Sequence, residues 1–146
     1  METARWLVVL VTLITVLLVV TLHYEVSVGL SRRLARSPLL GRRRVLLLIL
    51  GLLLAHVAEI WLFGAALWLL LREPGTGALV GFETLEFLDM VYMSAVTYTT
   101  LGYGDVVPRG DIRFLLGTEA LTGFMLITWS ASLTFLEMQQ HWRQGN

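Results

Sequence analysis

The residues whose types and spacing suggest chemistry form one short run, Thr100-Leu101-Gly102-Tyr103-Gly104-Asp105. Glycine at alternate positions lets the backbone take dihedral angles on both sides of the Ramachandran plot. A strand of alternating left- and right-handed residues can point successive carbonyl oxygens in one direction. A ring of such carbonyls can replace the water shell of a dehydrated cation. The run therefore predicts a row of backbone oxygen ligands, and the Thr100 hydroxyl would add another oxygen at its inner end.

The side chains beside this row are predicted to support it. Tyr103 points away from the ion and packs sideways against neighbouring helices. Thr99 leads into the row, and Asp105 caps the loop at its outer mouth and forms hydrogen bonds behind it. Pro108 closes the loop. Thr99 and Asp105 are therefore predicted as supports of the row and not as ligands.

Residues 89–108, DMVYMSAVTYTTLGYGDVVP, resemble the pore helix and selectivity filter of the potassium-channel pore-loop superfamily, especially small bacterial ion-channel proteins. The resemblance covers roughly residues 45–137. It implies that K+ binds at Thr100, Leu101, Gly102 and Tyr103, with Gly104 completing the filter. Leu101 stands where many relatives carry Val or Ile, which we expect to change packing and not selectivity. The alternative is a glycine-rich turn in a membrane protein of another kind.

Composition indicates a membrane protein. The chain has 146 residues, of which 56% are hydrophobic, and its mean hydropathy is +0.73. A soluble domain of this size is less apolar. Cysteine is absent, so the chain has neither disulfides nor a thiolate metal site.

The first apolar run, residues 6–22, carries no charge and has the minimum length of a membrane-spanning helix. A signal peptide is the rival interpretation. Against it, only Arg5 precedes the run and no small-residue cleavage site follows it. We therefore expect a retained transmembrane helix.

A basic loop follows, with six arginines in residues 32–44 and no acidic residue. By the positive-inside rule this loop lies in the cytoplasm. Topology alone explains the arginines, and contact with anionic lipid head groups is a further role to consider. The arginines are Arg32, Arg33, Arg36, Arg42, Arg43 and Arg44.

The second apolar run, residues 45–71, is long enough to span the bilayer with tilt and is the predicted outer helix. His56 and Glu59 lie on one face of it near mid-membrane, where ionisable groups usually meet a partner. We expect them to bond to each other or to the first helix, whose His23 and Glu25 lie nearer the cytoplasm. One interpretation is a structural polar clamp, and the other is a proton-sensitive gate.

Residues 75–81 are expected to form an extracellular loop. Residues 88–99 then read as a re-entrant helix, because a helix this short cannot cross the bilayer. Its C-terminal end would favour a cation through the helix dipole. Glu83, Glu86 and Asp89 precede or begin this helix. They could cap it or concentrate cations at the entrance, and the two roles are compatible.

The third span, residues 112–136, is the predicted inner, pore-lining helix. Gly123 lies close to the hinge glycine of related channels, and close helix packing explains it equally well. Glu119 is a candidate filter support, since Val96 stands where some relatives place an acid behind the filter. The hydroxyls of Thr128, Ser130, Ser132 and Thr134 either line a wet cavity or bond back to the helix.

The sequence thus predicts an all-α membrane protein with three transmembrane helices and a re-entrant pore helix and filter. Residues 1–44 hold the first helix and basic loop, 45–137 the pore domain, and 138–146 a short cytoplasmic tail. The resemblance implies a homotetrameric potassium channel in the bacterial inner membrane. The first helix lacks regularly spaced arginines, so voltage sensing is not expected. We expect no enzyme activity, no cofactor besides permeant K+, and no nucleic-acid partner.

Two other functions compete with this prediction. One is a non-conducting membrane scaffold or regulatory subunit with a pore-like fold, and the other is a weakly selective cation channel. An enzyme is disfavoured because His56 and Glu59 make only half a metal site, with no second histidine on that helical face.

Overall fold

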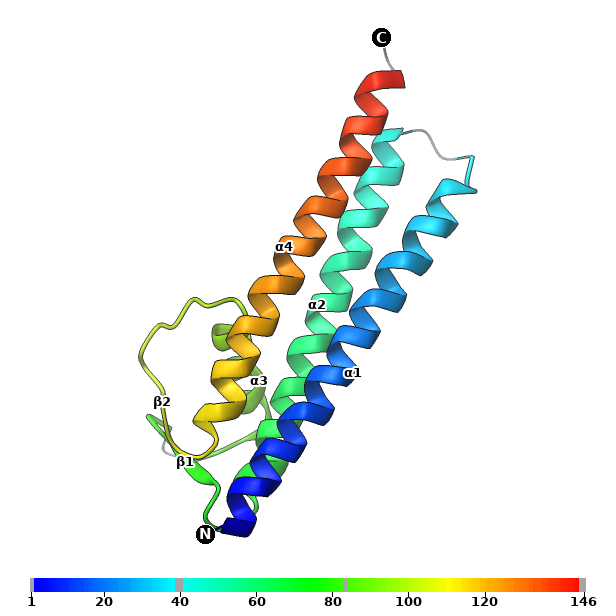
Figure 1. Ribbon diagram of the computed structural model, residues 1–146. Coiled ribbons are helices and arrows are strands. Elements are labelled where there is room, and N and C mark those ends of the chain that lie inside the picture. Colours follow the sequence, from blue (N-terminus) through cyan, green and yellow to red (C-terminus); the bar gives the residue numbers. More distant parts are fainter. Residues whose placement is uncertain (1, 39–40, 83, 145–146) are drawn as a thin grey trace.

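The computed structural model describes residues 2–38, 41–82 and 84–144. Within these residues three long helices lie side by side, and a short helix and two strands lie at one end (Figure 1). The N-terminus lies at that end, and the C-terminus lies at the other. In chain order the elements are α1 (Glu2–Ala35), α2 (Gly41–Leu71), β1 (Gly77–Val80), α3 (Phe87–Tyr98), β2 (Val107–Gly110) and α4 (Arg113–Gln144).

Three helices, α1, α2 and α4, are long and apolar enough to cross a membrane. Much of their surface consists of exposed leucine, valine and aromatic side chains, as expected for helices solvated by lipid. The short α3 has 12 residues, or about 18 Å at 1.5 Å per residue, which is too short to span. The predicted fold class, an all-α membrane protein with three spanning helices, is confirmed.

Two helices are longer than expected. Helix α1 extends well past residue 22 to Ala35, because His23 and Ser27 are buried against the other helices. Helix α4 continues to Gln144, through most of the segment expected as a tail. That segment begins with Met138, Gln139 and Gln140, which are good helix formers although glutamine is polar. Glu83 lies outside the described residues.

The hydrophobic core lies between α3 and the long helices. It consists of buried side chains from α2, α3 and α4, together with Val8 and Val19 of α1. The fully buried members on the other elements include Phe63, Leu67, Met90, Tyr98 and Leu115. Packing of this kind fixes the position of α3, and therefore of the loop that follows it.

A two-stranded ribbon forms where the sequence suggested only loops. Strands β1 and β2 pair antiparallel, with Gly77 opposite Gly110 and Val80 opposite Val107. Beside the ribbon, the Thr76 hydroxyl donates to the Leu70 carbonyl at 2.6 Å, and the Ile112 amide donates to the Thr76 carbonyl at 3.0 Å. The ribbon therefore joins the two ends of the segment that contains α3 and the loop after it.

The arginine-rich turn comprises the end of α1, residues 36–38 and the start of α2, and it lies at the end of the bundle opposite this ribbon (Figure 1). Five of the arginines in these parts are exposed. Arg44 instead forms an ion pair with Glu137 of α4. The arginine-rich turn and the loop that follows α3 thus lie at opposite ends, which is the arrangement that the topology prediction requires.

Candidate functional site

The loop after α3 is the first part of the candidate site. Every residue from Thr99 to Asp105 is exposed in the subunit, although the segment belongs to an apolar protein. Thr100, Gly102 and Gly104 have φ angles of 58°, 55° and 81°. Positive φ at every second residue is the alternation predicted from the glycine spacing. Thr100 is notable because a β-branched residue rarely adopts such an angle, and strained residues of this kind cluster at functional sites.

The loop begins by folding back on the end of α3. The Leu101 and Gly102 amides both point to the Val96 carbonyl oxygen, at 3.0 and 3.4 Å. The Thr100 amide donates to the Thr97 carbonyl at 2.9 Å, and the Thr99 hydroxyl donates to the Ala95 carbonyl at 2.7 Å. These bonds fix the inner end of the loop at the C-terminus of α3, where the helix dipole favours a cation.

At the outer end, Asp105 joins the loop to α3. The Tyr92 hydroxyl donates to Asp105 Oδ2 at 2.6 Å, and the Val106 amide donates to Oδ1 at 3.1 Å. This hydrogen bond to the carboxylate raises the pKa of Tyr92 to about 12, so the phenol keeps its hydrogen at neutral pH. Asp105 therefore has a partner behind the loop, as the sequence suggested, although Tyr92 was not foreseen as that partner.

Glu119 is buried in α4, behind α3. Its carboxyl group contacts the Ser94 hydroxyl of α3, which also donates to the Ile60 carbonyl of α2 at 2.8 Å. In the described part of the chain, Glu119 Oε2 has no hydrogen-bond partner. The Glu119 carboxyl group thus packs against α3, on the side where a filter support was expected. It contacts Ser94 of α3 and not the loop that follows α3.

Gly123 lies at a close approach between α4 and the end of α3. A Cβ built on Gly123 would overlap the Tyr98 carbonyl oxygen and would lie 2.8 Å from the Tyr98 ring. A glycine is therefore needed here for packing. Of the two interpretations weighed for Gly123, the contacts favour close packing.

The hydroxyl groups of α4 fall into two kinds. Thr128, Ser132 and Thr134 each donate to the carbonyl four residues earlier in the helix, at 2.7 to 2.9 Å. Ser130 differs, because its hydroxyl lies 3.0 Å from His56 Nε2. Among these four described residues, only the Ser130 side chain therefore forms a hydrogen bond with another helix.

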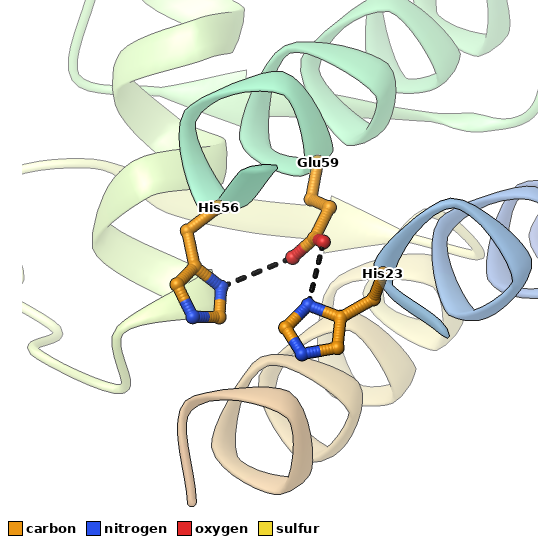
Figure 2. A group of neighbouring side chains, drawn as sticks. All are labelled: His23, His56 and Glu59. Carbon is orange, nitrogen blue, oxygen red and sulfur yellow. Dashed lines mark hydrogen bonds and ion pairs between the residues drawn. The ribbon is translucent and has the colours of Figure 1, made fainter. Parts of the chain in front are cut away.

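The second part of the candidate site is a buried polar network, and Figure 2 shows its centre. His56 and Glu59 come from α2 and His23 from α1, with their side chains turned toward one another. His23 Nδ1 lies 2.8 Å from Glu59 Oε1, and His56 Nδ1 lies 3.1 Å from Glu59 Oε2. His23 and Glu59 have no exposed surface. The sequence-based expectation that His56 and Glu59 bond to each other or to the first helix agrees with these contacts.

Two more side chains extend this network to all four helices. The Tyr98 hydroxyl of α3 donates to Glu59 Oε2 and lies 2.9 Å from His56 Nδ1. Ser130 Oγ of α4 faces the outer nitrogens of both imidazoles, at 3.0 Å from His56 Nε2 and 3.4 Å from His23 Nε2. Sequence reasoning missed Tyr98 and Ser130, since nothing in local spacing reveals contacts between residues so far apart in the chain.

Three comparisons with known proteins bear on these sites. A family model described as "Ion channel" matches residues 45–140. Over 92 residues the chain is 38% identical to "Two-pore potassium channel 4" of Arabidopsis thaliana. That match covers 63% of this chain and 28% of the relative, so the chain corresponds to less than a third of that protein. No solved structure matches the chain.

Proposed function

The chain belongs to the ion-channel family, and from this premise we propose that it conducts potassium passively across the membrane through a homotetrameric pore. One observation carries the proposal: the exposed, irregular loop from Thr99 to Asp105 is held among helices that can cross a membrane. Irregular backbone at membrane depth is tolerated only where it is buried in protein or lines a water-filled cavity. The loop therefore needs water and further copies of the chain around it.

Four copies meet this need. One loop cannot surround an ion, whereas a cyclic assembly places equivalent loops around a common axis. The subunit offers apolar surface for neighbours, since Leu101 and Tyr103 are 57% and 67% exposed. Leu121, Phe124 and Phe135 are exposed along α4 as well. Tyr103, expected to pack sideways, would find its neighbours in the adjacent subunit.

Within this pore, the backbone oxygens of Thr100, Leu101, Gly102 and Tyr103 are the proposed K+ ligands, and Gly104 completes the row. The name of the matched plant relative, a potassium channel, supports K+ as the ion. Thr99, Asp105 and Glu119 hold the loop through their contacts with α3. The permeant ion is the only cofactor in this proposal.

The buried polar network and the arginine-rich turn are proposed to position this pore in the membrane. We propose that His56 and Glu59 form a clamp that fixes α1 against the other helices, since both bond within the buried network. The exposed arginines of the α1–α2 turn face the cytoplasmic head groups, where anionic lipid would neutralise them. The chain forms an integral membrane protein, and its resemblance to small bacterial channels supports the bacterial inner membrane as its location.

The test is ion flux through purified protein in proteoliposomes. We expect potassium efflux that far exceeds sodium efflux under matched gradients, from particles whose native mass corresponds to four subunits. Equal potassium and sodium flux would indicate a weakly selective cation channel. Absence of flux for either ion from folded, oligomeric protein would indicate a non-conducting scaffold or regulatory subunit.

A further inference from the structure

The network of α1 and α2 brings together three side chains that commonly bind transition metals. One ligand atom each from His23, His56 and Glu59 lies within 4.8 Å of the others, although His23 comes from a different helix (Figure 2). We propose that this cluster binds one Zn2+ ion per subunit, through Nδ1 of each imidazole and the Glu59 carboxylate. This inference does not depend on conduction, because it concerns only the inside of one subunit.

The spacing of the ligand atoms suits such an ion. With bonds of about 2.1 Å, ligands of a tetrahedral zinc site lie about 3.4 Å apart. The two nitrogen-to-oxygen separations observed without an ion are 2.8 and 3.1 Å. These distances end on different carboxylate oxygens, Oε1 for His23 and Oε2 for His56, and one ligand atom from each of the three residues lies within 4.8 Å of the others. The side chains would therefore have to rotate to bring all three ligand atoms onto one ion.

The outer nitrogens of the imidazoles give the strongest support. A histidine that binds metal through Nδ1 carries its hydrogen on Nε2, and that hydrogen usually has an acceptor. Ser130 Oγ faces both Nε2 atoms and has two lone pairs, so it can accept from both. When no metal is bound and both imidazoles are neutral, the two Nε2 atoms compete for the single Ser130 hydrogen, which leaves one of them without a partner.

The surroundings also supply support for the carboxylate. The Tyr98 hydroxyl donates to Glu59, as second-layer donors do for carboxylates that bind metals. His56 and Ser130 line a cavity of about 470 Å³ between α2 and α4. A tetrahedral site would need one further ligand besides these three side chains, such as a water molecule. Two nitrogen ligands and one carboxylate favour Zn2+ over Ca2+ or Mg2+, which prefer oxygen.

The experiment uses the full chain, purified without a polyhistidine tag, stripped with a chelator and then given Zn2+ alone. We expect one zinc per subunit by elemental analysis and a rise in melting temperature, since an ion that binds the folded state stabilises it. His23→Gln and His56→Gln should each weaken binding by at least about tenfold. The matched control is His141→Gln, which removes the third histidine of the chain, near the end of α4, and should leave binding unchanged.

A second measurement needs no variant. Co2+ bound in place of zinc should show the intense visible absorption of a four-coordinate ion in the unaltered protein. A weak, six-coordinate spectrum would overturn the proposal, and so would zinc affinity that is equal in the unaltered protein and in folded His23→Gln. The cobalt spectrum of the unaltered protein remains decisive if a histidine variant fails to fold.

Discussion

At the scale of single residues, Gly102 and Gly104 should be the most sensitive positions of the loop. Both have positive φ angles, and a Cβ built on either meets no atom within 4 Å in the subunit. Alanine would therefore introduce backbone strain of about 1–2 kcal/mol without a clash inside the chain. We expect Gly102→Ala and Gly104→Ala to fold normally and to abolish potassium flux in proteoliposomes.

A matched control for these variants is Gly29→Ala in α1, where a Cβ also meets no atom within 4 Å and the backbone is helical. Flux should persist in this control. Normal flux and selectivity in both loop variants would show that the loop does not form the filter.

Glu119 allows a second prediction at this scale. The Ser94 hydroxyl has one hydrogen but lies beside two acceptors, the Ile60 carbonyl and the Glu119 carboxyl group. A glutamine brings its own hydrogens to this contact, whereas alanine leaves a cavity and a lost bond. We expect Glu119→Gln to retain most of the stability and Glu119→Ala to lower the free energy of unfolding by about 2–4 kcal/mol, measured by thermal unfolding in detergent. Equal losses in both variants would contradict this account.

Residue spacing was enough to predict the loop, but not its partners. The alternation of Gly102 and Gly104 reflects a local backbone requirement, which a sequence shows directly. The bond from Tyr92 to Asp105, and the approach of His23 to Glu59, depend on how helices pack. The position of an ionisable group within an apolar helix predicts that the group has a partner. Which residue is that partner depends on the tertiary structure.

At the scale of the elements, α4 packs on α3 through Gly123. Because a Cβ there would overlap the end of α3, Gly123→Ala should separate the two helices or displace Tyr98. We expect a loss of stability of about 1–3 kcal/mol, seen as a lower melting temperature in detergent.

Gly117→Ala is the matched control, in the same helix with open space around the added methyl group. It should be neutral or stabilise the helix by up to about 1 kcal/mol. If Gly123→Ala keeps full stability and changes only the open probability of the channel, the hinge interpretation would replace the packing one.

The elements also show where sequence reasoning stopped. Hydropathy located the three spanning helices because lipid imposes a long apolar run. The polar ends of α1 and α4 carry no such signal, so both helices were expected to be shorter. The pairing of β1 with β2 joins segments on either side of α3, and no local pattern in residues 77–80 and 107–110 indicates it.

At the scale of the whole molecule, the arrangement predicts that the β1 end faces the outside of the cell and the arginine-rich turn faces the cytoplasm. The chain has no cysteine, so single engineered cysteines report without background. A cysteine at Ala78, exposed in β1, should react with an impermeant thiol reagent added outside sealed cells. A cysteine at Arg36, in the arginine-rich turn, should react only after the membrane is opened. The reverse pattern would refute the topology.

The polar network has a consequence for how the chain enters the bilayer. A charged side chain at the centre of an inserting helix costs about 3 kcal/mol, and α2 brings Glu59 with no partner on its own face except His56. Helix α1 is synthesised first and carries His23, which bonds to Glu59 in the folded subunit. We therefore expect the two helices to insert more favourably as a hairpin than one after the other, with α1 assisting the insertion of α2.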